Sequence, residues 1–175
     1  MYKLRMTCRR VRFLLAIAAL VTGDVSASAR AQQFQPTGRD TLRGLPGVEI
    51  MVEPIEPALE RAGLNAREIR ADVGRQLEAG GVTVYASQTD NPSSAKPYVY
   101  VQVVGVALDR QAFAIELQVH LRQTLRSPVT GSNIVNAMTW DQHTVMVTPS
   151  GRMDGVRSAI REAVAEFVTD WQAVH

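Results

Sequence analysis

The chain has 175 residues, of which 46% are apolar, 21% charged and 6% aromatic. This composition is typical of a globular protein and excludes a disordered or fibrous chain. A single cysteine, Cys8, excludes a disulfide framework and a cysteine-rich metal site. The formal net charge is +2, but many of the basic residues lie at the start of the chain.

Residues 1–31 have the pattern of a secretory signal peptide. Residues 1–12 carry five basic and no acidic side chains, and residues 13–21 are apolar throughout. Small residues follow and end in Ala29-Arg30-Ala31, an A-x-A cleavage site. The apolar run is shorter than the ~20 residues that span a bilayer. We therefore expect export, cleavage near Ala31, and a soluble protein without a membrane span, in the periplasm or outside the cell.

Cleavage would reverse the sign of the net charge. After residue 31 the chain keeps 13 basic and 16 acidic side chains, a net charge of −3. The basic residues are scattered, whereas nucleic-acid binding needs a basic patch or stripe, so we expect no nucleic-acid partner. A lipoprotein would carry a cysteine directly after the apolar run, but Cys8 precedes it.

The first half of the remaining chain predicts one strand and one helix. Residues 32–46 are polar and rich in Gly and Pro, and we interpret them as a flexible leader before a single domain over 47–175. Alternation over 48–52 predicts a strand, and residues 58–62 a helical turn. Asn65 has the position of an N-cap for a helix that ends at Gly80-Gly81.

The second half is dominated by strands. A short strand is expected at 82–85, and long strands at 98–108, 112–125 and 134–148. The apolar phase of the last strand changes, which predicts a bulge near residues 141–144. An apolar stripe at helical spacing predicts a final helix over 153–174.

The element order β-α-β-β-β-β-α predicts an α+β fold of two layers. We expect one mostly antiparallel five-stranded sheet with two helices on one of its faces, because the last three strands are joined by short connections. The other face would then be free. Its predicted binding surface consists of Tyr98, Tyr100, Gln102, Glu116, Gln118, His120 and Arg122. Tyrosines among polar side chains are typical of protein interfaces.

Candidate catalytic residues are few. Asp141 and His143 form an Asp-x-His pair on one face of a strand, where the carboxylate could orient an imidazole as a base. Thr139 is the nearest candidate nucleophile, but no Gly-x-Ser-x-Gly motif is present. We expect His120 to lie on a solvated face. Since no third ligand accompanies the two strand histidines, we expect no metal and no other cofactor.

One segment carries a family resemblance. The helix end Leu77-Glu78-Ala79-Gly80-Gly81 runs into Val82-Thr83-Val84, and a meander and a C-terminal helix follow. This order resembles uncharacterised bacterial exported domains and, more loosely, the N-terminal domain of the Tol–Pal translocation protein and the lipoprotein activators of penicillin-binding proteins. The resemblance implies an α/β envelope module that binds other proteins and has no catalytic residues. It assigns no functional residue.

Three functions stay open at this level. The sequence favours an exported bacterial envelope protein that is a non-enzymatic interaction or accessory module, with another envelope protein as partner. The first alternative is a small periplasmic hydrolase that uses Asp141 and His143. The second is a carrier of a small ligand, with a cavity lined by Trp140, Phe167 and Trp171.

Overall fold

A computed structural model describes residues 38–108 and 111–175. The predicted signal peptide and the first part of the predicted leader lie outside these residues. The later part of that leader is described, and Gly38–Leu42 forms a 3-10 helix, η1. Leu42 is fully buried in the core of the domain. This end of the leader is therefore packed against the domain, because Leu42 inserts into the core and Leu45 packs against it.

All five strands belong to a single sheet of order β2-β1-β3-β4-β5. The strands are β1 (Val48–Val52), β2 (Val84–Tyr85), β3 (Tyr98–Ala107), β4 (Ala112–Arg126) and β5 (Asn133–Pro149). β3, β4 and β5 form the expected antiparallel meander. β1 is parallel to both β2 and β3, since a helix or a long loop separates each pair. The predicted α+β class is confirmed, with a mixed sheet.

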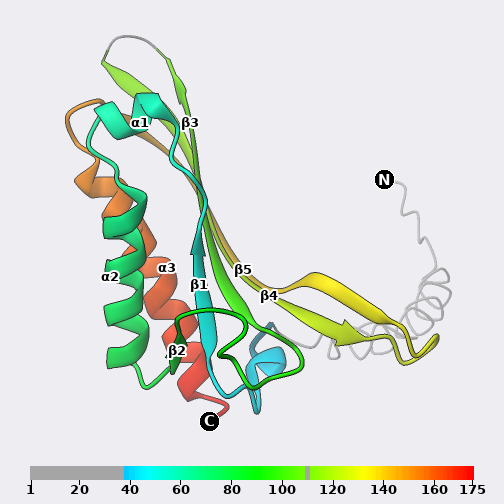
Figure 1. Cartoon of the computed structure of the whole chain (residues 1–175). Coiled ribbons are helices and arrows are strands. Elements are labelled where there is room, and N and C mark those ends of the chain that lie inside the picture. The colour runs from blue at the N-terminus through cyan, green and yellow to red at the C-terminus, as the bar shows by residue number, and fades with distance from the viewer. Residues whose placement is uncertain (1–37, 109–110) are drawn as a thin grey trace, which may run out of the picture. The chain divides into compact units, whose positions relative to one another are not determined.

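Two long helices cover one face of the sheet. They are α2 (Ala66–Ala79) and α3 (Asp154–Gln172), and a short helix, α1 (Pro57–Arg61), precedes them. Figure 1 shows α2 and α3 side by side on the same side of the strands. The Asn65 side chain caps α2 by accepting hydrogen bonds from the backbone N–H groups of Arg67 and Glu68, as expected. Gly81, at a φ of 85°, ends the turn after α2.

The core lies between the helices and this face of the sheet. Strand alternation and helical periodicity determine which residues are buried in the core, because every second residue of β4 and one stripe of each helix point inward. The buried residues include Val99, Val101, Val103, Ile115, Leu117, Val119 and Leu121 from the sheet and Ile69, Val73, Leu77, Val156, Ile160, Val164, Phe167 and Trp171 from the helices.

The end of β4 and the start of β5 bend away from α2 and α3 (Figure 1). Register shifts fall between Leu121 and Arg122 and between Gln123 and Leu125, and Asn136 has a φ of 57°. The bulge predicted near residues 141–144 is therefore wrong in position, because pairing is regular from Trp140 to Pro149. The irregularity lies where the hairpin bends, since bulges sharpen strand twist and bending.

Candidate functional site

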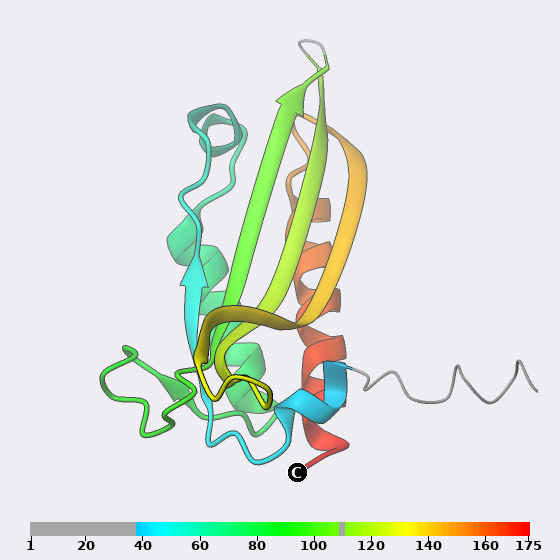
Figure 2. The same cartoon turned by 90° about the vertical axis from the view of Figure 1, so that its right-hand side faces the viewer.

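The face of the sheet opposite the helices is not covered by any of the described helices, and we call it the open face (Figure 2). The strand register places all seven residues of the predicted binding surface on it. Along the rows of the sheet, Glu49 aligns with Tyr98 and Arg122, Met51 with Tyr100, His120 and Asp141, and Gln102 with Gln118 and His143. The register therefore places these seven residues on one face, and the role of that face in binding stays a prediction.

Two residues of this face are less exposed than the sequence suggested. Tyr98 and His120 are each only 6% exposed, although both point away from the helices. The bent β4–β5 hairpin explains the burial of Tyr98, whose hydroxyl donates to Asn136 Oδ1 at 3.4 Å. Thr124 N donates to Ala95 O at 2.7 Å and ties the hairpin to the loop before β3. The expectation of a solvated His120 was wrong.

Tyr100, His120 and Arg122 form a cluster on the open face. The Arg122 guanidinium lies 4.6 Å from the centre of the Tyr100 ring, and the Tyr100 and His120 rings are 6.2 Å apart. Burial, and then a hydrogen bond with the Glu53 carboxylate, raise the pKa of Tyr100. Burial, and then the positive charge of Arg122, lower the pKa of His120, although Asp141 opposes this shift. Neutral His120 can therefore act as a hydrogen-bond donor and acceptor at neutral pH.

Three side-chain atoms on this face are buried and have no hydrogen-bond partner among the described residues. They are Glu49 Oε2, His120 Nδ1 and Arg122 Nε. They are also the full set of such side-chain atoms in the described part of the chain. Native proteins satisfy most buried polar atoms, so each exception calls for an explanation. All three belong to residues of the open face.

The predicted Asp141–His143 pair does not form. His143 Nε2 instead lies 3.0 Å from Glu116 Oε1 on the neighbouring strand. Asp141 is the register partner of His120. Thr139 lies in the irregular part of β5, and its hydroxyl accepts a hydrogen bond from Gln123, not from a histidine. Glu116 is a diagonal neighbour of His143, whose direct register partner is Gln118. Diagonal cross-strand neighbours are within reach of long side chains, so contacts between strands replace the predicted contact within one strand.

The residues suggested for a ligand cavity pack against one another instead. Trp140 and Phe167 make an edge-to-face contact at 5.1 Å, and the ring centres of Phe167 and Trp171 are 6.0 Å apart. Trp140 Nε1 donates to Asp170 at 3.0 Å, which satisfies its buried polar atom. These rings are part of the core, so they line no cavity of their own.

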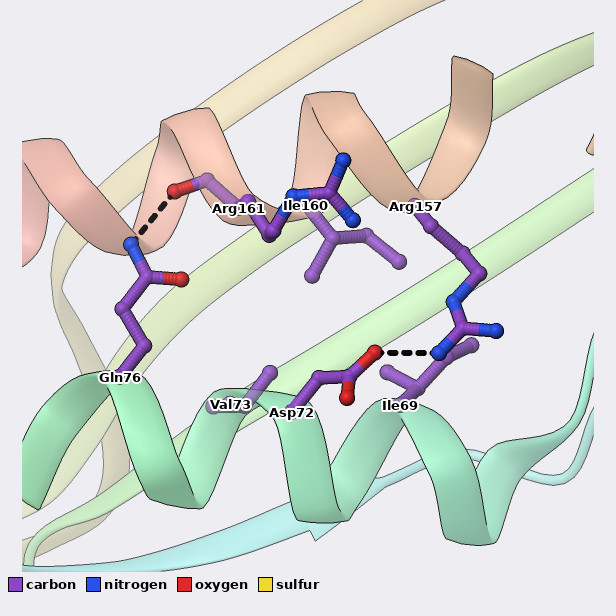
Figure 3. A pocket seen from close by; sticks show the side chains of 7 residues that line it. All are labelled: Ile69, Asp72, Val73, Gln76, Arg157, Ile160 and Arg161. Atoms are coloured by element: carbon purple, nitrogen blue, oxygen red, sulfur yellow. Dashed lines mark hydrogen bonds and ion pairs between the residues drawn. The ribbon is translucent and has the colours of Figure 1, made fainter. Parts of the chain in front are cut away.

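A small hollow lies between α2 and α3 (Figure 3). Its volume is about 10 Å³, which is no larger than one water molecule requires. Asp72 and Arg157 form an ion pair across it, and Gln76 donates to the backbone oxygen of Arg161 at 2.8 Å. The hydrogen bond from Arg157 lowers the pKa of Asp72. We assign these contacts to helix–helix packing.

Sequence reasoning missed the exposed apolar residues of the open face. Val106, Val145 and Val147 are 63–69% exposed, and Met138 and Met51 are also exposed. The alternation of Val145 and Val147 with polar residues indicated that both valines face one side of the sheet. The change of apolar phase along this strand was interpreted as a bulge instead. In the regular register of β5, this phase places both valines on the open face.

Membrane-spanning helices and clusters of metal ligands are two further features that bear on function. Within 38–108 and 111–175, no helix has the length and apolar character needed to cross a membrane. The same residues contain no group of three or more His, Cys, Asp or Glu side chains placed to hold a metal ion.

Comparison with known proteins gives distant similarities. No protein-family model matches the chain. One similar structure is a "putative lipoprotein" from Caulobacter crescentus, with 16% identity, a TM-score of 0.34, and coverage of 77% of this chain and 93% of that chain. Another is a minor lipoprotein from Acinetobacter baumannii, with 9% identity, a TM-score of 0.29, and coverage of 73% and 87%. Such TM-scores do not establish a common fold, and the resemblance to the Tol–Pal and activator proteins stays a prediction.

Proposed function

We propose that this chain is an exported bacterial envelope protein that binds another protein through the open face and has no catalytic activity of its own. The signal-peptide pattern of residues 1–31 supports export. The observation that carries the binding role is the set of unpartnered buried atoms of Glu49, His120 and Arg122 on one face. The three atoms are not exposed in the unbound chain, so a bound protein would supply their missing hydrogen bonds after small side-chain movements, and it would exclude water from the Tyr100 cluster.

The geometry gives less support to the two alternatives. A hydrolase with an Asp141–His143 pair would need these side chains in contact with each other and with a nucleophile, but His143 pairs with Glu116. A carrier would need a cavity at Trp140, Phe167 and Trp171, whose rings pack together. The open face therefore remains the surface on which we place the function.

Site-specific cross-linking in the native host tests this proposal. A photo-reactive amino acid is placed at Gln102, in the middle of the open face, and separately at Glu162, which is exposed on α3. We expect a reproducible adduct with one envelope protein from position 102 and none from position 162. Adding Arg122→Ala to the Gln102 variant should weaken the adduct. No adduct from position 102, or equal adducts from both positions, would refute the role of the open face.

A further inference from the structure

The open face is acidic. Glu49, Glu53, Glu116 and Asp141 point to it, and strand alternation gives it two basic residues, Arg122 and Arg126, both on β4. With both histidines neutral, its formal charge is −2. No described ion pair with lysine or arginine neutralises any of these four carboxylates, since Glu116 pairs with His143 alone.

Most of the net charge of the chain after residue 31, which is −3, lies on this face. Outside the open face, this part of the chain has 11 basic and 12 acidic side chains, which nearly balance. On the helix side, several carboxylates are paired with arginines, such as Asp170 with Arg39 at 2.6 Å and Glu68 with Arg157 at 2.9 Å. The negative charge of the predicted mature protein is therefore concentrated on the face that no helix covers.

Apolar side chains lie beside the carboxylates. Glu116 aligns with Val104 on β3 and Val145 on β5, and the next row aligns Val106, Ala114 and Val147. Val106, Val145 and Val147 are each more than 60% exposed. Contiguous exposed apolar residues rimmed by polar ones are a mark of protein interaction surfaces.

Of the three buried atoms on this face that lack a partner in the described part of the chain, Glu49 Oε2 accepts hydrogen bonds, Arg122 Nε donates one, and His120 Nδ1 can do either. Glu49 Oε2 is a buried carboxylate oxygen without a donor among the described residues. His120, more than nine-tenths buried, has Nδ1 unpartnered on the same face. A carboxylate oxygen accepts hydrogen bonds only, so the group that satisfies Glu49 must carry N–H or O–H.

We infer that the partner presents lysine or arginine side chains next to apolar ones, as a basic amphipathic segment of another protein does. This inference rests on the proposed binding role of the open face. Apolar residues of the segment would cover Val106, Val145 and Val147. Its basic residues would reach Glu116 and Asp141, and also Glu49 on β1 and Glu53 directly after β1. A second copy of this chain fits poorly, because it would bring one face of charge −2 against another.

Titration with two synthetic peptides tests the chemistry of the partner. One is an amphipathic Leu/Lys peptide, and the other has Glu at every Lys position. Binding to the protein purified after export is measured by calorimetry at low and at physiological salt. We expect the Lys peptide to bind, more weakly at higher salt, and the Glu peptide not to bind. Glu116→Gln and Asp141→Asn should each lower the affinity roughly 2- to 5-fold.

Glu162→Gln on α3 is the matched control, because it removes the same charge from a helix and should leave the affinity unchanged. Equal binding of both peptides, or equal affinity of Glu116→Gln and the control, would refute the inference. A dimer in sedimentation that Glu116→Gln strengthens would also refute it, in favour of a second copy. Failure of the Lys peptide together with a cross-link from Gln102 would leave the proposed function standing and overturn only the basic partner.

Discussion

Replacing His120 by phenylalanine should stabilise the fold and weaken binding. The ring of His120 is 6% exposed, and Nδ1 has no partner among the described residues. Phenylalanine keeps an aromatic ring opposite Tyr100, which lies 6.2 Å away. It removes the polar atom whose burial is uncompensated in the unbound protein. Stability and binding should therefore change in opposite directions.

The expected gain depends on pH. An unsatisfied buried polar group costs about 1–3 kcal/mol of stability. Because the phenylalanine ring will not fit the site perfectly, we expect His120→Phe to raise the free energy of unfolding by only about 1 kcal/mol at pH 7.5. That gain would raise Tm by roughly 3–5 °C. Burial and Arg122 lower the native pKa of His120, so below about pH 6.5 the unfolded chain binds a proton that the native protein does not. Stability of the unsubstituted protein therefore falls as pH decreases, by at most about 1.4 kcal/mol per pH unit.

Urea denaturation of both proteins at pH 7.5 and pH 5.5 measures these differences. The advantage of His120→Phe should be larger at pH 5.5, because the variant lacks the titrating group. In the cross-linking assay the variant should give a weaker adduct from position 102. If His120→Phe lowers the free energy of unfolding by more than about 1 kcal/mol at pH 7.5, Nδ1 of His120 is satisfied in the native state and the reasoning is wrong. The same pH dependence of stability in both proteins would also refute it.

Three further predictions concern the scaffold. Asn65→Ala should lower the free energy of unfolding by about 1 kcal/mol in urea, because two backbone donors of α2 lose their acceptor, whereas Asn65→Asp should have little effect. Phe167→Ala should cost about 3–5 kcal/mol in the same assay, since the ring is buried against Trp140; a loss below 1 kcal/mol would contradict the core assignment. Asp72→Asn should make the free energy of unfolding fall less steeply as pH decreases below about 4. The lowered native pKa of Asp72 stabilises the fold above the unfolded pKa of 3.8, and this stabilisation is lost as pH falls through the native pKa. At pH 7 the substitution should lower the free energy of unfolding by less than about 1 kcal/mol, since Arg157 is a third exposed.

The local elements could be predicted from the sequence because their signals are local. The bounds of β1 were predicted to the residue, and β3, β4, β5 and α3 to within two residues. Alternation in β4 identified the buried face without knowledge of its neighbours. The cap at Asn65 follows from side-chain chemistry within one turn.

The site could be predicted only in part because it depends on contacts between strands. Alternation placed Tyr100, His120 and Arg122 on one face, but it could not show that a bent hairpin buries Tyr98. Nor could it pair His143 with Glu116, since that contact depends on the register of β4 and β5. The apolar half of the face was missed because the phase of Val145 and Val147 has two interpretations, and only the observed register separates them.

The order of the elements along the chain affects when the domain can fold. Six of the nine buried residues that α2 and α3 contribute come from α3, which follows all five strands. A chain that crosses a membrane with its N-terminus first delivers α3 after the whole sheet. The sheet would thus lack most of its helical cover until α3 has crossed, so the polypeptide would stay unfolded enough to be threaded and then close its core in one late step on the far side.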